Sequence, residues 1–416
     1  MLYDILARRP VNGKMHIEFD SISFFDFRTK VEEIKHWLCD LKQQIIGLRM
    51  ENELSGLAIV TAISSTNKTC ILIPEKYDSS SQKPDYEMLI LAKPGFKYDV
   101  EYGSTTEEQA ESGGLILFTS GTSGKPKRHK WKWQELFNNR LLRGFDPDTN
   151  WLCGYSVDSY AGIQAFGFAM SSAENAIFVK SIDSISSLSK DYKVWHLMLA
   201  TPTFFKRIIY TEINYSVRSV SISGEPVSQI FIERIKRVLK PSRIIHIYAT
   251  TELGSIFSVS DGKAGFPLSW LGRKLKTGYS LFENQGVLLV QKPSSDELIS
   301  TNDKVIFDAD RVHIVGRADD VINVGGFKVF RTQIEEAILE IEGVQDALVL
   351  SIPNPITGNL VTVEIVACDK MNIHELERKI KIYIGQNFRK EAIPRAIRFV
   401  DSIAITRNGK KRISAD

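Results

Sequence analysis

The sequence predicts a two-domain protein, with a large α/β domain over residues 1–315 and a small α+β domain over residues 316–416. Its 416 residues exceed what one ordinary core accommodates. Apolar runs that end in loops of small and polar residues recur through the first part of the chain. Beyond Gly316 the order of helix and strand patterns changes. These three observations predict the fold class.

The first elements read as a helix followed by a buried strand. Apolar residues recur at helical spacing over residues 29–48, and the apolar stretch 57–63 is typical of a buried strand. Three further apolar runs, 115–118, 217–222 and 244–248, each pass directly into small or polar residues. Open α/β sheets bind ligands in the loops at the carboxyl ends of their strands. We therefore expect these loops to form the functional site.

The chain after Gly316 predicts a compact α+β unit of its own. Thr332 and Glu335 fit a capping box at the start of a helix. The segment 316–326 before it is expected to be a hinge between the domains. The expected elements are a helix at 332–341, strands at 347–352 and 360–368, a helix at 373–388 and a strand near Ala396.

Composition excludes several classes of protein. The formal charge of +3, from 53 basic and 50 acidic residues, gives no field that indicates nucleic acid or an anionic membrane as a partner. Four widely spaced cysteines predict neither a disulfide framework nor a zinc site, so a reducing cytoplasm is expected. No stretch stays apolar for long enough to predict a membrane span, and the first residues do not read as an export signal.

Residues 119–127, TSGTSGKPK, have the composition of a phosphate-binding loop. Glycines allow close backbone approach, while hydroxyl, amide and lysine groups converge on a small volume. The loop is not a Walker A motif, because Pro126 follows Lys125 where a serine or threonine is needed. It is not a nucleophile elbow either. A flexible, solvated loop is the alternative reading of this stretch alone.

The loop resembles the phosphate-loop signature of the adenylate-forming superfamily, which includes acyl-CoA and aryl-CoA ligases, luciferases and peptide-synthetase adenylation domains. Other segments that resemble motifs of these AMP-binding enzymes follow in the family's order. They read SGEP (223–226), YATTE (248–252), TND (301–303), GRADDVINVGGFK (316–328) and TRNGK (406–410). The resemblance implies an acyl-CoA synthetase-like fold, shortened before Thr119.

The resemblance also implies a nucleotide site. Tyr248 would stack on adenine, Asp303 would accept hydrogen bonds from the ribose hydroxyls, and Arg317 would contact ribose or phosphate. A turn is the alternative role for Asp303 alone. The residues implied to bind ATP are Thr119, Ser120, Gly121, Thr122, Ser123, Gly124, Lys127, Gly224, Glu225, Pro226, Tyr248, Asp303 and Arg317.

Catalytic roles follow from the same resemblance. Thr251 would contact the α-phosphate and Glu252 would hold Mg²⁺, a hard cation that prefers oxygen ligands. Lys410, rather than Lys411, occupies the motif position and would stabilise charge on the acyl oxygen and the departing pyrophosphate. Alone, Thr251 and Glu252 could cap a helix, and Lys410 could belong to a solvated tail.

The resemblance assigns conformational roles to the segment between the predicted domains. Asp319 would be the pivot of a rotating small domain, and Gly325 with Gly326 would leave room for a pantetheine arm. An ordinary turn is the alternative for these glycines. Two departures from the family pattern stand at Ala249 and Asn302, where the family has glycine.

Residues 151–170 are expected to contribute to the pocket for the acid. Asp158 stands near the position where amino-acid-activating members place a carboxylate for the substrate ammonium, and a turn or cap is its alternative role. Nearby aromatic residues suit an aryl or acyl group, although a core role explains them equally well.

Three functions are consistent with the sequence. The first is ATP-dependent activation of an aryl or fatty acid to acyl-AMP, followed by transfer to the thiol of CoA. The second is a standalone enzyme that loads an acyl or amino acid onto a phosphopantetheinyl carrier protein. The third is a non-catalytic nucleotide-binding protein, and the presence of Glu252 and Lys410 argues against it.

Overall fold

The computed structural model describes most of the chain and divides it into two compact units, Met1–Leu199 and Ala200–Asp416. The predicted functional boundary between residues 315 and 316 stays a prediction. The described residues are 1–18, 20–74, 86–103, 113–119, 127–137, 146–211, 214–293, 295–318, 320–368, 371–404 and 411.

The first unit is an α/β structure with two groups of mainly parallel strands. One group has the order β6-β5-β3-β4-β7-β8, and the other has the order β12-β9-β10-β1-β2. The strands are β1 (Lys14–Ile17), β2 (Asp20–Ser23), β3 (Ile45–Met50), β4 (Thr69–Leu72), β5 (Met88–Lys93), β6 (Lys97–Tyr102), β7 (Gly114–Thr119), β8 (Lys127–Lys132), β9 (Asp146–Cys153), β10 (Ala173–Phe178), β11 (Val194–Trp195) and β12 (Leu197–Ala200).

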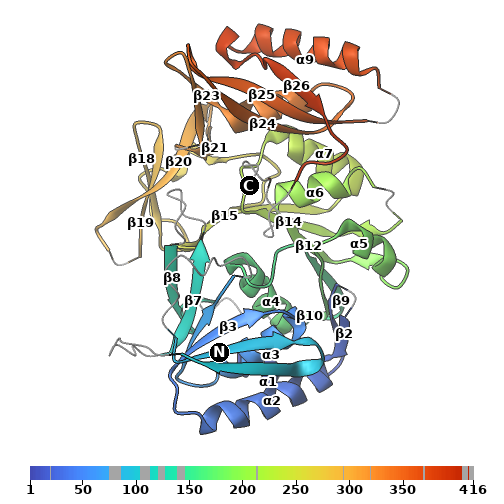
Figure 1. Ribbon diagram of the computed structural model, residues 1–416, viewed down its shortest axis with the longest axis vertical. Helices are drawn as coiled ribbons and strands as arrows, with labels where there is room; N and C mark the ends of the chain where they lie inside the picture. Colours follow the sequence, from blue (N-terminus) through green and yellow to red (C-terminus); the bar gives the residue numbers. More distant parts are fainter. Residues whose placement is uncertain are drawn as a thin grey trace. The chain divides into compact units, whose positions relative to one another are not determined.

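Helices of the first unit share one core with these strands. That core includes Phe27 and Leu38 of α2, Leu57 and Val60 of α3, and Phe166 of α4. Full burial of such side chains stabilises the fold by about 1.5–3 kcal/mol each. The helical segments are α1 (Leu2–Arg8), α2 (Phe24–Asp40), α3 (Glu53–Ile63), the 3-10 turn η1 (Pro94–Phe96), α4 (Tyr160–Ser172) and α5 (Ile182–Leu188) (Figure 1).

The predicted strand at 57–63 is wrong, because this stretch lies in α3. Every residue of α3 is buried, so the helix has no polar face and its sequence shows no helical period. The side chain of Asn52 begins the helix by accepting a hydrogen bond from the N–H of Ser55 over 2.9 Å. The C-terminal part of the expected first helix is also corrected, because residues 45–50 form strand β3.

The second unit begins with two helices and a group of strands, β14, β15 and β16. β14 and β15 run parallel, and β16 returns antiparallel to β15. These elements are α6 (Pro202–Ile208), β13 (Ser216–Val217), β14 (Ser219–Ser223), α7 (Gln229–Leu239), β15 (Arg243–Thr250) and β16 (Gly254–Val259).

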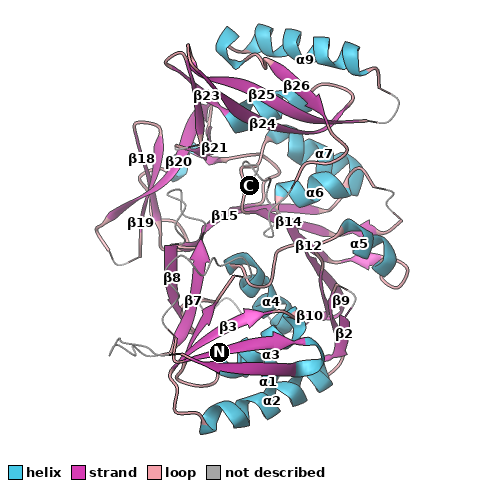
Figure 2. Ribbon diagram, in the orientation of Figure 1, coloured by secondary structure: helices cyan, strands magenta, loops and turns pink. Residues whose placement is uncertain are grey.

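A five-stranded antiparallel sheet follows, with the order β17-β21-β20-β19-β18. It places β20 beside β21, so that Asp303 lies opposite Arg317. Figure 2 shows that strands predominate in this stretch between β16 and α8. The elements are β17 (Phe266–Pro267), the 3-10 turn η3 (Leu268–Trp270), β18 (Ser280–Asn284), β19 (Val287–Gln291), β20 (Leu298–Asp308) and β21 (Arg311–Arg317).

The last part of the chain confirms the predicted α+β order of elements. The strands follow the order β23-β22-β25-β24, with β26 paired to β25. Leu376, Ile380 and Ile384 lie one helical turn apart on α9 and are buried in this core. The elements are β22 (Val321–Val324), β23 (Phe327–Phe330), α8 (Arg331–Leu339), β24 (Val344–Asn354), β25 (Gly358–Ala367), α9 (Ile373–Asn387), the 3-10 turn η4 (Lys390–Ala392) and β26 (Ala396–Phe399).

The predicted capping box at Thr332 and Glu335 is wrong. Helix α8 begins after Phe330, which makes no side-chain cap hydrogen bond. Glu335 instead turns toward β24 and accepts a hydrogen bond from the N–H of Val349 over 2.9 Å. Nowhere in the described part of the chain is a helix both long and apolar enough to cross a bilayer.

Candidate active site

Two of the predicted motifs meet at the carboxyl ends of neighbouring parallel strands. Ser223, the last residue of β14, pairs in register with Ile247 of β15. Gly224 follows with a φ of +90°, a conformation that glycine adopts without steric cost. Tyr248 follows Ile247, so the SGEP and YATTE segments emerge at the same edge of the sheet. This is the position where open α/β sheets bind ligands.

Tyr248, Asp303 and Arg317 form a polar group at this edge. The hydroxyl of Tyr248 donates to Oδ2 of Asp303 over 2.5 Å, and Nη1 of Arg317 lies 3.8 Å from Oδ1 of the same carboxylate. Arg317 also donates to the carbonyl oxygen of Thr301 over 3.4 Å. Asp303 is buried, whereas Arg317 is exposed. The first and last of these three residues, Tyr248 and Arg317, lie 69 positions apart in the sequence, and the structure brings them together.

Burial and the charge of Asp303 raise the pKa of Tyr248 well above its ordinary value. The hydroxyl therefore stays protonated at neutral pH and keeps donating to the carboxylate. The ring of Tyr248 stacks on Phe257, with a centroid separation of 5.1 Å. A carboxylate has about four acceptor positions, which is more than the single hydroxyl of Tyr248 occupies.

The two departures from the family's glycines have different local explanations. Asn302 has a φ of +61° within β20, and asparagine is one of the few residues besides glycine that often adopts this conformation. Its carbonyl oxygen accepts from the N–H of Ala318 over 2.7 Å. Ala249 lies in β15 at a shift of register and has no positive φ, so it does not require glycine. Both residues lie within the strands that carry their motifs.

Thr251 and Glu252 lie in the turn between β15 and β16 rather than at the start of a helix. Thr250 supports this turn, because its Oγ1 accepts a hydrogen bond from the N–H of Leu253 over 3.0 Å. Glu252 is exposed. Among the described residues no three histidine, cysteine or carboxylate side chains gather as a metal cage. A single exposed carboxylate suits Mg²⁺, which is commonly held by one or two carboxylates, water and substrate phosphates.

The carboxylate of Glu225, in the SGEP segment, accepts hydrogen bonds at the N-terminus of helix α6. Its Oε2 accepts from the N–H of Thr203 and its Oε1 from the Thr203 hydroxyl, each over 2.9 Å. The hydroxyl of Thr201 caps the same helix by accepting from the N–H of Phe204. Negative charge at a helix N-terminus is stabilising. The side chain of Glu225 therefore has a structural partner in α6. Its predicted role in binding a nucleotide stays a prediction.

Residues 120–126 of the phosphate loop, which include the predicted Ser120, Gly121, Thr122, Ser123 and Gly124, lie outside the described residues. The backbone on either side is described, and Thr119 of β7 pairs with Lys127 of β8. Lys127 is exposed. The antiparallel pairing of β7 with β8 therefore brings the two ends of the loop together.

Asp158 lies in the turn that precedes α4. Its Oδ1 accepts a hydrogen bond from the hydroxyl of Ser156 over 2.5 Å. The helix cap is the neighbouring residue Ser159, whose hydroxyl accepts from the N–H of Gly162. Phe166 of α4, an aromatic residue within the 151–170 stretch, is fully buried in the core. A role of Asp158 toward a substrate stays a prediction.

Gly325 and Gly326 form the two-residue loop between β22 and β23. Their φ values of +60° and +86° are those of a tight hairpin turn that glycine favours. A side chain at Gly326 would meet no atom within 4 Å, so backbone conformation and not lack of space explains the glycine. The predicted pivot Asp319 and the predicted catalytic Lys410 lie outside the described residues.

Lys411, directly after the predicted catalytic lysine, is a residue that the sequence did not single out. Its ammonium lies 3.0 Å from Oε2 of Glu335 and 3.0 Å from Oδ1 of Asp346. Lys411 lies 65 positions after Asp346 and 76 after Glu335 in the sequence, so no local pattern predicts the cluster. The feature of the sequence that could have indicated Lys411 is its position directly after the TRNGK segment.

Comparison with known proteins was made against family models, curated sequences and solved structures. The model described as "AMP-binding enzyme" matches residues 20–297, and the model described as "AMP-binding enzyme C-terminal domain" matches residues 333–410. A 3,4-dihydroxybenzoate–[aryl-carrier protein] ligase of Bacillus anthracis is 23% identical, over 94% of this chain and 95% of the relative. A 2-succinylbenzoate–CoA ligase of Listeria monocytogenes is 24% identical, over 71% and 68%.

The fold is also found among solved structures. ATP-bound MatB from Rhodopseudomonas palustris superposes with a TM-score of 0.74 at 17% identity, over 99% of this chain and 96% of that one. Together with the two family models, this likeness confirms the predicted fold class of a large N-terminal α/β domain followed by a small α+β domain.

Proposed function

The chain belongs to the AMP-binding enzyme family, and from this premise we propose that it activates a carboxylic acid with ATP and transfers the acyl group to the thiol of CoA. The observation that supports this most directly is the Tyr248–Asp303–Arg317 group at the ends of the strands. It presents an aromatic ring, a buried carboxylate and an exposed guanidinium together, which suits adenine, ribose and phosphate respectively.

In the first half-reaction, a carboxylate oxygen of the acid attacks the α-phosphorus of ATP. A new P–O bond forms, the bond to the bridging oxygen breaks, and pyrophosphate leaves with the electron pair. We assign Thr251 to the α-phosphate and residues 119–127 to the polyphosphate. Asp303 would fix the ribose, and Tyr248 would orient Asp303 through the hydrogen bond that links them. Glu252 would hold Mg²⁺, whose charge offsets that of the phosphates.

Lys410 is the proposed catalytic cation of the first half-reaction. The acyl oxygen and the departing pyrophosphate both carry negative charge that a positioned ammonium stabilises. In the second half-reaction a thiolate attacks the acyl carbon, the thioester C–S bond forms, and AMP leaves with the acyl C–O electron pair. We propose that residues 316–416 then rotate about Asp319 relative to residues 1–315, which presents the Gly325–Gly326 turn to the thiol arm.

The names of the relatives indicate which class of acid and which thiol acceptor to test first. The Bacillus and Listeria relatives are named for 3,4-dihydroxybenzoate and 2-succinylbenzoate, so an aryl acid is the first class to test and a fatty acid the second. The Listeria relative uses CoA, but the Bacillus relative acts on an aryl-carrier protein. Loading of a phosphopantetheinyl carrier is therefore the second candidate function. The four free cysteines suit a reducing cytoplasm.

The test is exchange of labelled pyrophosphate into ATP by the full chain, with Mg²⁺ and a panel of aryl, fatty and amino acids. Exchange with at least one acid is expected, and Lys410→Ala should lower it by about 100- to 1,000-fold. Accepted acids are then offered with CoA or with a phosphopantetheinylated carrier, and the product is identified by mass. Thioester on the carrier alone would overturn the proposal for CoA. Nucleotide binding without any exchange would favour the non-catalytic alternative.

A further inference from the structure

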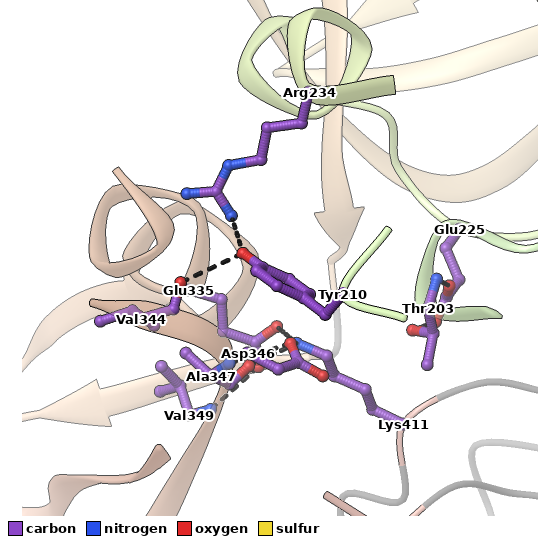
Figure 3. A network of polar contacts seen from close by, with 10 residues as sticks. All are labelled: Thr203, Tyr210, Glu225, Arg234, Glu335, Val344, Asp346, Ala347, Val349 and Lys411. Atoms are coloured by element: carbon purple, nitrogen blue, oxygen red, sulfur yellow. Dashed lines mark hydrogen bonds and ion pairs between the residues drawn. The ribbon is translucent and has the colours of Figure 1, made fainter. Parts of the chain in front are cut away.

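Lys411 is held in a desolvated cluster of opposite charges. Its side chain is 8% exposed, and those of Glu335 and Asp346 are 14% and 13% exposed. Besides the two carboxylates, the ammonium donates to the carbonyl oxygen of Ala347. An ammonium has three donors, and here all three have an acceptor (Figure 3). The side chain is therefore fully engaged inside the fold rather than solvated.

The two carboxylates are themselves fixed by the backbone of β24. The second oxygen of Glu335 accepts from the N–H of Val349, and Oδ1 of Asp346 accepts from the N–H of Ala347. Burial alone would lower the pKa of Lys411, but the attraction of Glu335 and Asp346 outweighs it and raises the pKa above its ordinary range. The lysine therefore stays charged. Its two carboxylate partners are held by the backbone of β24, so they have little freedom to move with it.

The cluster lies where helices α6 and α7 contact α8 and β24. Tyr210, just after α6, donates to the carbonyl oxygen of Val344 over 3.3 Å and accepts from Nη1 of Arg234 over 2.9 Å. Arg234 of α7 donates to the carbonyl oxygen of Leu339 at the end of α8. Figure 3 shows the contacts of Tyr210 with Val344 and Arg234 beside the Lys411 cluster, and it also draws Glu225 with Thr203 at the start of α6. Lys206 of α6 interacts electrostatically with Lys411, Asp346 and Glu335, so the cluster lies close to the helix that Glu225 caps.

We propose that Lys411 is a positioning residue for the adenylation step, because its buried ion pairs fix the main chain at the position next to Lys410. This inference rests on the proposed function, in which Lys410 is the catalytic cation. Neighbouring Cα atoms are about 3.8 Å apart, so anchoring one residue strongly restricts where the next can lie. A misplacement of about 1 Å at a reacting centre can lower a rate by about 100-fold.

The test compares Lys411→Met with the matched control Lys379→Met. Lys379 also forms an ion pair, with Glu375 over 2.8 Å, but on the exposed side of α9. Lys411→Met should lower kcat for pyrophosphate exchange by about 10- to 100-fold, with little change in the KM for ATP. It should leave thioester formation from preformed acyl-AMP close to that of the unsubstituted chain. Lys379→Met should change neither half-reaction.

Because Lys411→Met leaves two buried carboxylates without their partner, it could also destabilise the fold. The triple variant Lys411→Met/Glu335→Gln/Asp346→Asn removes all three charges and should regain thermal stability. Its pyrophosphate exchange should stay low, because the ion pairs that fix the main chain at residue 411 are still missing.

Three results would overturn the inference: unchanged exchange in Lys411→Met, equal loss of both half-reactions in variants that melt normally, or full recovery of exchange in the triple variant. Absence of exchange in the unsubstituted chain would instead contradict the proposed function, and this role of Lys411 with it.

Discussion

Asp303 accepts from Tyr248 on one oxygen and faces Arg317 with the other, so one buried carboxylate links two strands of an antiparallel sheet to the end of a parallel strand. Such a group has a structural and a ligand-binding interpretation. The structural one is supported by the observed contacts. The ligand-binding interpretation is supported by the exposed guanidinium of Arg317 beside the carboxylate. A substitution that keeps the shape and removes the charge separates the two.

We predict that Asp303→Asn raises the KM for ATP in pyrophosphate exchange by about 10- to 100-fold, since hydrogen bonds to a charged group contribute about 1.5–3 kcal/mol. Asp308→Asn, an exposed change on the same strand, is the control and should leave the KM unchanged. Thermal melting of both variants checks the fold. An unchanged KM for ATP in Asp303→Asn, with a lowered melting temperature, would assign the residue a structural role alone.

The sequence identified residues of this group because each stands in a motif, but it could not show their contacts. Nothing in the spacing of Tyr248 and Asp303 indicates that the tyrosine hydroxyl donates to the carboxylate. The positive φ of Asn302 was equally hidden, although it explains why a residue tolerant of that conformation stands in the glycine position. Motifs predict which residues gather, whereas the hydrogen bonds between them depend on tertiary packing.

Helix α6 shows how one element can connect a motif to the rest of its unit. The carboxylate of Glu225 caps its first turn, and Tyr210 beyond its last turn contacts β24. The helix has only seven residues. Isolated helices of this length are unstable in water, so α6 depends on its cap and on the burial of Phe204 and Phe205.

We predict that Glu225→Gln lowers the free energy of unfolding by about 1 kcal/mol, because an amide caps the helix without the carboxylate's charge and with one acceptor oxygen fewer. Chemical denaturation of the full chain measures this change. Glu233→Gln, on the exposed side of α7, is the control. If Glu225→Gln instead weakens ATP binding and leaves stability unchanged, the cap is not the main role of Glu225.

At the scale of elements, the prediction succeeded where an amphipathic pattern or a motif marked the element. The order of helices and strands after Gly316 agrees with the sequence, and α9 carries its apolar residues on one face. The sequence failed for α3, whose complete burial removes the helical period. It also failed for the capping box of α8, because Glu335 has tertiary partners on β24 and at Lys411. Long-range contacts overrode local preference in both cases.

Across the whole molecule, ionisable groups from distant parts of the sequence gather around α8. Lys206 of α6 and Lys411 near the chain end face Glu335, Glu336 and Asp346. The near-neutral charge of the chain gives no indication of this concentration. Charge balance in the sequence describes the average field, whereas the cluster depends on which residues the fold brings together.

Glu336 makes this cluster sensitive to pH. Burial raises the pKa of Glu336 to about 7 from its ordinary value of 4.5, against the attraction of Lys206 and with added repulsion from Glu335. The folded state therefore binds more protons than the unfolded state between these values, and stability contributed by this group falls as pH rises from about 4.5 to 7. His246 acts in the opposite sense, because burial lowers its pKa to about 4.

We predict that Glu336→Gln stabilises the protein above pH 7 by up to about 3 kcal/mol and by much less near pH 4.5, since an amide carries no charge to bury. The measurement is the difference in unfolding free energy between the unsubstituted chain and the variant, followed from pH 4.5 to pH 8. Taking the difference removes the contribution of His246, which both proteins share. Glu342→Gln, an exposed change just after α8, is the control. If the difference for Glu336→Gln is the same at both ends of the range, then Lys206 compensates the charge of Glu336 in the folded state, and burial does not control its protonation.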